Sequence, residues 1–132
     1  MERFCKNCGK ELHNKSVKFC NQKCQQDFYY KEYIKLWKDG KKDGLRGKYQ
    51  TSMYIIRYLF EKYDSKCARC GWNTKNIFTG NIPLEIEHID GNYLNNNEDN
   101  LTLLCPNCHA LTETYKGANR GNGRHDRKKY TK

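Results

Sequence analysis

The stretch IPLEIEHIDGNYLNNNEDNLTLLCPNCHALTETY, at residues 82–115, decides the fold of this chain. Residues 82–88 alternate apolar and polar side chains, which predicts a strand with one buried face. Asp90-Gly91 marks a turn, and a polar loop over 92–100 leads to a second short strand at 101–104. The sequence therefore predicts two strands joined by a polar loop.

A helix is expected directly after the second strand. Pro106 suits its first turn, because the missing N–H of proline has no partner there in any case. We expect the helix to run to about Tyr115, with Gly117 beyond its end. The predicted order is strand, loop, strand and helix, closed at its ends by cysteines.

Two of the four histidines of the chain fall in this stretch. His109 and Glu113 lie four residues apart on the expected helix and therefore share one face. A hairpin folded onto that helix would bring Glu87 and His88 to the same place. Imidazoles and carboxylates together suit a divalent cation, although the same residues also occur as ordinary surface or capping groups.

Eight cysteines fall into two groups of four. Thiolates two or three residues apart can both reach one tetrahedral ion, with Zn–S bonds of about 2.3 Å. A disulfide framework or a redox pair is the alternative, but the N-terminus has no apolar export segment and no βαβ pattern is present. We therefore expect two structural zinc ions, held by Cys5-x2-Cys8 with Cys20-x3-Cys24 and by Cys67-x2-Cys70 with Cys105-x2-Cys108.

The composition indicates a small, metal-stapled domain that binds a polyanion. Only 36% of the 132 residues are hydrophobic, too few for a large apolar core. No run approaches the ~18 apolar residues of a membrane span, and we expect a cytoplasmic protein. The net charge of +10 is divided into +7 over residues 1–50, −3 over 51–115 and +6 over 116–132. Basic flanks suit phosphate backbones and an acidic middle suits a cation.

Four parts are predicted along the chain. Residues 1–38 form a zinc knuckle, with His13 in its loop, followed by a helix over 25–38 with Tyr30, Tyr33, Ile34 and Trp37 on one face. Residues 39–50, with three glycines, form a basic connector. Residues 51–115 form the second domain, beginning with a helix over about 52–63 whose apolar stripe is Ile56, Leu59, Phe60 and Tyr63. Residues 116–132 form a basic tail.

The second domain resembles the HNH endonuclease family. The matching motifs are Glu87-His88-Ile89-Asp90-Gly91, Asn100-Leu101 and Cys105-Pro106-Asn107-Cys108-His109, in that order and with interleaved CxxC pairs. The resemblance covers residues 67–115, and the stretch WKDGKKDG with the first four-cysteine group looks like small phage-encoded members. It implies a small α+β fold with a ββα-metal nuclease domain.

The resemblance also implies a role for each matching residue. His88 looks like the general base that takes a proton from water, and Asn100 like the asparagine that braces the loop. Glu87 and His109 look like ligands of a catalytic Mg²⁺ or Mn²⁺, and Glu113 stands where some members have a further ligand. Members more often have Asp or His in place of Glu87. Neighbours on a strand face opposite sides, so Glu87 and His88 share one site only if the strand deviates there, and Glu85 is the substitute ligand if Glu87 points away.

The implied function is metal-dependent hydrolysis of double-stranded DNA, leaving 5′-phosphate and 3′-hydroxyl ends. One active site per chain favours nicking by a monomer. The alternatives are a catalytically silent zinc-ribbon module that binds nucleic acid and an accessory protein of phage packaging. The residues expected to contact DNA are basic ones of the connector and the tail: Lys41, Lys42, Arg46, Lys48, Arg120, Arg124, Arg127, Lys128 and Lys129.

Overall fold

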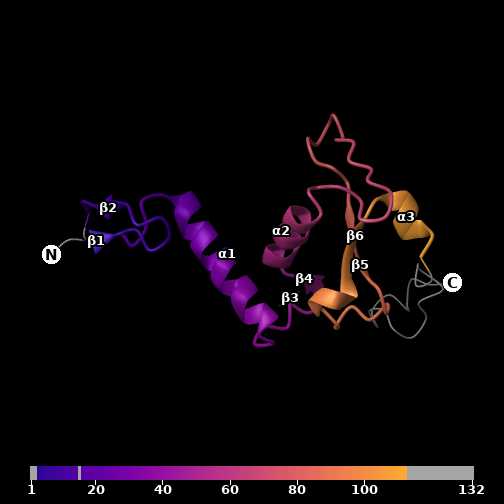
Figure 1. Cartoon of the computed structure of the whole chain (residues 1–132), viewed down its shortest axis with the longest axis horizontal. Helices are drawn as coiled ribbons and strands as arrows, with labels where there is room; N and C mark the ends of the chain where they lie inside the picture. Colours follow the sequence, from indigo (N-terminus) through magenta and orange to yellow (C-terminus); the bar gives the residue numbers. More distant parts are fainter. Residues whose placement is uncertain (1–2, 15, 113–132) are drawn as a thin grey trace. The chain divides into compact units, whose positions relative to one another are not determined.

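A computed structural model describes residues 3–14 and 16–112 (Figure 1). The backbone contacts divide the chain into two compact units, residues 1–41 and 42–132. Two cysteine groups that could hold metal lie in a small α+β framework, one group in each unit. None of the helices in these described ranges is long and apolar enough to cross a bilayer.

The first unit consists of a short hairpin and one long helix. Strand β1 (Arg3–Phe4) pairs antiparallel with β2 (Glu11–Leu12), and α1 spans Gln22–Lys38. The helix begins three residues earlier than its apolar pattern predicted, because the Asn21 side chain caps it by accepting a bond from the Cys24 N–H at 2.8 Å.

Aromatic side chains connect α1 to the knuckle of the first unit. Phe19 lies 5.4 Å from Phe28 and 5.8 Å from Tyr29, between ring centroids. The predicted apolar face contributes Tyr30 and Trp37 as buried residues. The ring contacts with Phe19 therefore come from Phe28 and Tyr29, which lie beside the predicted apolar face.

The second unit opens with a hairpin where the sequence predicted a connector over 39–50. Strand β3 (Leu45–Arg46) pairs with β4 (Gln50–Thr51), and the turn between them contains Gly47 at φ 67°. The Asp43 carboxylate accepts a bond from the Leu45 N–H at 2.9 Å and fixes the entry to the hairpin. Glycine and basic residues in this stretch thus serve a tight turn.

Helix α2 (Met53–Lys62) follows directly, with Ser52 as its N-cap. Leu59 of the predicted stripe is fully buried, at 0% exposure. Ile55, which lies outside that stripe, is equally buried. Ser52 is also buried, so the inward face runs through 52, 55 and 59. Ile56 and Phe60 flank this face and are half-buried.

The predicted two strands and helix are observed with different bounds. Strand β5 (Glu85–His88) pairs antiparallel with β6 (Leu101–Leu104), and α3 (Pro106–Ala110) packs against both. The first strand is shorter than predicted, and the helix ends at Ala110 instead of near Tyr115. The Leu111 N–H turns back to the Cys108 and His109 carbonyls, which closes the last turn.

Strand β6 lies at the centre of the second unit. It packs against α2 and pairs with β5, and its backbone also accepts a bond from the Ala68 N–H to the Leu103 carbonyl at 2.8 Å. Leu101 and Leu103 are fully buried, and Leu104 packs in a cluster with three buried cysteines. A strand covered on both faces reads as a continuous apolar run, as Leu-Thr-Leu-Leu nearly does.

The close approach of Gly44 to Asn96 yields a test of this packing. A Cβ built on Gly44 would lie 2.6 Å from Asn96 Cβ and 2.7 Å from Ile55 Cδ1. Gly44→Ala should lower the free energy of unfolding by about 1–3 kcal/mol more than Gly80→Ala. Gly80 is the matched control, because it has a similar φ of 75° but nothing within 4 Å. Urea unfolding of the metal-loaded protein measures both variants. Equal losses of unfolding free energy for Gly44→Ala and Gly80→Ala would contradict the close approach of Gly44 to Asn96.

Candidate active site

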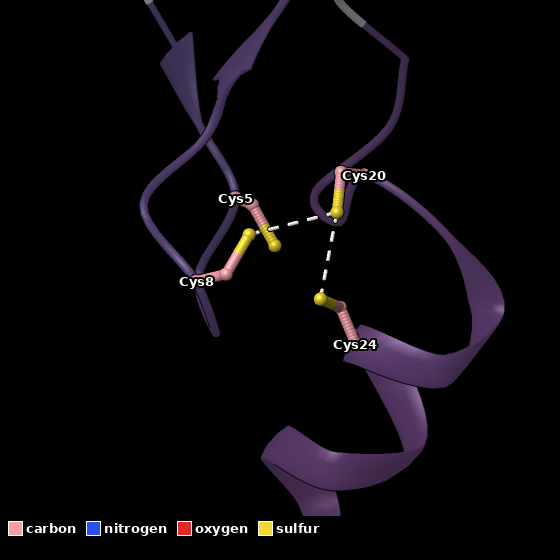
Figure 2. A group of neighbouring side chains, drawn as sticks. All are labelled: Cys5, Cys8, Cys20 and Cys24. Atoms are coloured by element: carbon pink, nitrogen blue, oxygen red, sulfur yellow. Dashed lines mark hydrogen bonds between the residues drawn. The ribbon is translucent and has the colours of Figure 1, made fainter.

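The first cysteine group brings together residues from the β1–β2 turn and from the start of α1 (Figure 2). The Cys8 and Cys20 sulfurs are 3.6 Å apart, and the Cys20 and Cys24 sulfurs are 3.4 Å apart. All four cysteines are free of disulfides. These separations are close to the edge of about 3.8 Å expected for a tetrahedron with Zn–S bonds of about 2.3 Å. The group therefore fits a tetrahedral metal ion.

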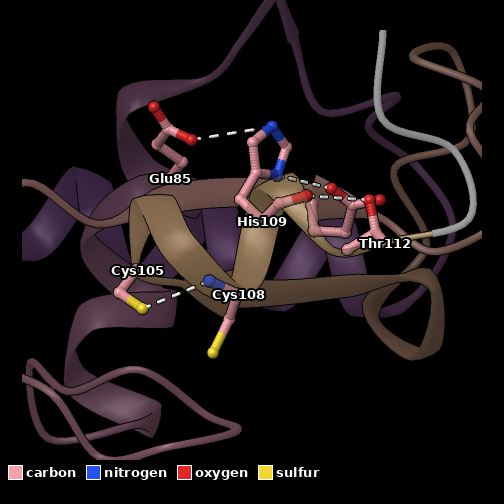
Figure 3. Close-up of polar contacts among 6 residues, drawn as sticks. Glu85, Cys105, Cys108, His109 and Thr112 are labelled. Carbon is pink, nitrogen blue, oxygen red and sulfur yellow. Dashed lines mark hydrogen bonds and ion pairs between the residues drawn. The ribbon is translucent and has the colours of Figure 1, made fainter. Parts of the chain in front are cut away.

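The second cysteine group has the same chemistry inside the second unit. Its four sulfurs lie within 4.8 Å of one another, with Cys70 and Cys105 at 3.6 Å. Cys67, Cys105 and Cys108 are buried and contact Leu104. The Cys105 thiol caps α3 by accepting a bond from the Cys108 N–H (Figure 3). The group therefore joins the 67–72 turn to the end of β6 and the start of α3.

The thiols of each group cannot all ionise at neutral pH without a cation. Burial raises the pKa of Cys67, but bonds from backbone N–H groups outweigh it and lower the pKa to about 6. Burial, with hydrogen bonds to the other thiols, raises the pKa of Cys108 to about 12. In the first group the pKa of Cys5 is lowered to about 6, against burial, by backbone N–H groups, and that of Cys20 is raised to about 12, chiefly by Cys24. Four thiolates so close together need a positive ion.

Carboxylate oxygens and imidazole nitrogens that could bind a metal ion lie where β5 meets α3. The Glu87 Oε2 atom is 2.7 Å from His109 Nδ1. The Glu85 Oε2 atom is 3.5 Å from His109 Nε2, a contact drawn in Figure 3. Glu87 is 6% exposed, whereas the Glu85 side chain is 50% exposed. The alternation of the strand places both carboxylates on the face that α3 covers. Glu87 and the substitute Glu85 therefore both lie beside His109.

The Glu87–His109 contact has the separation expected of two ligands of one ion. Neighbouring ligands at about 2.1 Å from a six-coordinate ion lie about 3.0 Å apart. The two atoms approach at ion-pair distance without the alignment of a hydrogen bond. Among residues 3–14 and 16–112, three or more metal-binding side chains meet only in the cysteine groups. The pair could therefore provide two ligands for a metal ion.

His88 makes its side-chain contact on a different element. Its Nε2 atom lies 2.7 Å from Asn96 Oδ1, and Asn96 is buried in the loop between the strands. No local pattern singles out Asn96, because it lies within a run of three asparagines. Only the folding of the loop distinguishes it from its neighbours.

Asn100 holds the ends of this loop together. Its Oδ1 accepts from the Asp90 N–H at 3.0 Å, and its Nδ2 donates to Asp90 Oδ1 at 2.9 Å and to the Asn95 carbonyl at 2.8 Å. Burial raises the pKa of Asp90, but hydrogen bonds from Asn95, Asn92 and Asn100 and the charge of His88 outweigh it, so its pKa lies below the usual value. Asn100 contacts the loop, and Asn96 contacts the histidine.

The remaining predicted residues are placed in three ways. Lys42, Arg46 and Lys48 lie on or beside the β3–β4 hairpin, and Lys41 follows α1 in the first unit. His13 is exposed in the first unit. The other predicted residues lie outside the described part of the chain: Glu113, Arg120, Arg124, Arg127, Lys128 and Lys129.

Comparison with known proteins identifies the class to which this site belongs. Residues 67–113 match the model of the HNH endonuclease family, which covers β5, β6, α3 and the second cysteine group. This segment of the chain therefore resembles HNH endonucleases. It is also 58% identical over 59 residues to the H-N-H endonuclease F-TflIV of Escherichia phage T5. The matched region covers 42% of this chain and 24% of that protein, and no solved structure matches.

The cysteine groups should bind two zinc ions with separate structural effects. Cys105→Ser should unfold the second unit, because metal binding and folding are coupled in small sites. Cys8→Ser should lower the zinc content from about two to about one per chain while the second unit stays folded. Elemental analysis and the near-ultraviolet circular dichroism of Trp72 and Tyr58 test this. Folded wild-type protein without zinc would contradict it.

Proposed function

We propose that this protein is a metal-dependent endonuclease that hydrolyses phosphodiester bonds of double-stranded DNA. The observation that carries the proposal is the contact of buried Glu87 with half-buried His109 at 2.7 Å, placed by β5 and α3 inside the HNH segment. Glu87 and His109 would hold the ion, with Glu85 and Glu113 as further candidate ligands. When bound, a divalent cation such as Mg²⁺ or Mn²⁺ supplies positive charge against the scissile phosphate and the leaving 3′-oxygen.

His88 is the general base of the proposed reaction. A neutral imidazole can accept the proton of the attacking water. Asn100 keeps the loop after His88 closed through its bonds to Asp90 and Asn95. Attack on phosphorus with departure of the 3′-oxygen leaves a 5′-phosphate and a 3′-hydroxyl.

The β3–β4 hairpin is the proposed contact surface for the DNA backbone. It carries Lys42, Arg46 and Lys48, and its Tyr49 ring lies 5.8 Å from the Tyr93 ring of the active-site loop. The hairpin is therefore held against the loop that follows His88. Cations fixed there are suited to phosphates that flank the cleaved bond. Lys41 and the basic tail are further candidates for this role.

One active site per chain predicts the product of the proposed reaction. A monomer with a single ββα-metal site cuts one strand per encounter, so the expected product is nicked DNA.

Two structural zinc ions would hold the knuckle of the first unit and the ribbon of the second. The homology to a phage protein favours action in the cytoplasm of an infected host.

Cleavage should depend on His88. Purified protein should nick supercoiled plasmid in the presence of Mg²⁺ or Mn²⁺, and His88→Ala should slow nicking by about 10²–10⁴-fold, as expected for loss of a general base. His13→Ala is the matched control, since this exposed histidine lies in the other unit. Gel analysis of the nicked form measures both rates.

Three outcomes would separate the functions. Equal rates for wild type and His88→Ala would contradict the role of His88. Tight DNA binding without any cleavage by folded, zinc-loaded protein would favour a silent nucleic-acid-binding module. Failure to bind DNA would favour an accessory protein instead.

The hairpin cations should dominate the salt dependence of DNA binding by the second unit. Replacing Lys42, Arg46 and Lys48 by Ala should weaken binding and reduce the slope of log K against log[salt] by up to about 2.7, at ~0.9 per lost phosphate contact. Arg57→Ala is the control, because Arg57 pairs with Glu61 on α2 at 3.3 Å. An unchanged slope, measured by fluorescence anisotropy, would exclude this surface.

A further inference from the structure

The Asn96 amide is the group that meets His88. Its Oδ1 atom lies 2.7 Å from His88 Nε2, and the residue is 4% exposed. A buried amide must satisfy its oxygen and both of its N–H groups within the protein. The partners of Asn96 therefore decide which end of the amide faces the histidine.

Two backbone carbonyls fix the orientation of this amide. The Asn96 Nδ2 group donates to the Asp43 carbonyl at 3.2 Å and to the Tyr93 carbonyl at 3.3 Å. Flipping the amide would put its oxygen against two carbonyl oxygens, which can only accept hydrogen bonds. The oxygen must therefore face His88. Since an amide oxygen only accepts, His88 Nε2 must donate and carry the hydrogen.

We propose that Asn96 is a positioning residue that holds neutral His88 as the Nε2–H tautomer. The lone pair of the ring is then on Nδ1, which is the atom that accepts the proton from water. This inference rests on the proposed endonuclease function for its catalytic meaning. The tautomer itself is a property of the folded protein and can be measured without catalysis.

The hairpin of the second unit supports this arrangement from outside the HNH segment. Asp43 precedes β3, and neighbouring Gly44 leaves room for Asn96, whose Cβ would be 2.6 Å from any Cβ at position 44. The Ser52 N–H donates to the Gly44 carbonyl at 2.8 Å and fixes this backbone to the start of α2. The orientation of His88 thus depends on a residue 45 positions earlier in the chain, Asp43.

The test measures the tautomer and the kinetics of the same variants. Protein labelled with ¹⁵N-histidine is studied by long-range ¹H–¹⁵N correlation at about pH 8, where imidazoles are neutral. The signals of His88 are those lost in His88→Gln. The variants are Asn96→Leu, which removes every amide contact, and Asn96→Asp, which keeps an acceptor for Nε2–H but loses both N–H bonds to the backbone carbonyls. Asn97→Ala is the control, because this neighbouring asparagine is exposed.

Wild type, Asn97→Ala and Asn96→Asp should show Nε2–H, and Asn96→Leu should show a mixture of tautomers. In Asn96→Leu, kcat for plasmid nicking should fall about tenfold or more, since a wrong tautomer costs other histidine bases up to ~10⁴-fold. Its KM for DNA should stay within about twofold, and Asn96→Asp should recover part of kcat. If the variants only lost stability, kcat would not depend on whether the side chain at position 96 can accept a hydrogen bond from His88.

Two results would overturn the inference. One is a wild-type His88 ring protonated on Nδ1. The other is an Asn96→Leu variant that retains both the Nε2–H tautomer and the wild-type kcat. Absence of nicking by the wild-type protein would refute the endonuclease function, whereas the wild-type spectrum would still decide the tautomer.

Discussion

The convergence of four cysteine sulfurs at the end of β6 is the constraint on which the second unit depends. Cys67 and Cys70 come from a turn that follows α2, and Cys105 and Cys108 from the start of α3. Because α3 is only five residues long, its own backbone bonds cannot hold it in place. The cysteine group, Leu104 and the half-buried Trp72 do so instead. His109 is the next residue after Cys108, so the position of its ring follows directly from that group.

The His88 half of the site depends on the loop between β5 and β6, which side-chain hydrogen bonds hold together. Between β5 and β6 the backbone makes few regular bonds, and asparagine and aspartate side chains replace them. Asn100 closes the loop on Asp90 and Asn95, while Asn96 reaches His88 and the Asp43 carbonyl. A loop with this many internal bonds can hold an imidazole in one orientation although it contains only one turn of 3₁₀ helix, Glu98–Asn100.

The two halves of the site are anchored on opposite faces of β5, because neighbouring residues of a strand point opposite ways. Glu87 points to α3 and contacts His109, and His88 contacts Asn96 of the loop. The strand therefore supplies a proposed metal ligand and a proposed base from consecutive residues. The burial of Glu87 at 6% exposure and the 50% exposed side chain of Glu85 distinguish two carboxylates that the sequence alone leaves equivalent.

Short-range sequence patterns were sufficient to predict much of the fold of this protein. The sequence by itself determined the two cysteine groups, the bounds of β6 and the start of α3, because CxxC spacing, an apolar run and a proline act over a few residues. It missed the early end of α3, which carbonyl bonds of the last turn decide. Long-range contacts are what make the connector a hairpin against the loop and bring Asn96, among three consecutive asparagines, to His88. Contacts such as Asp43 to Asn96 join residues 53 positions apart, and no local pattern records them.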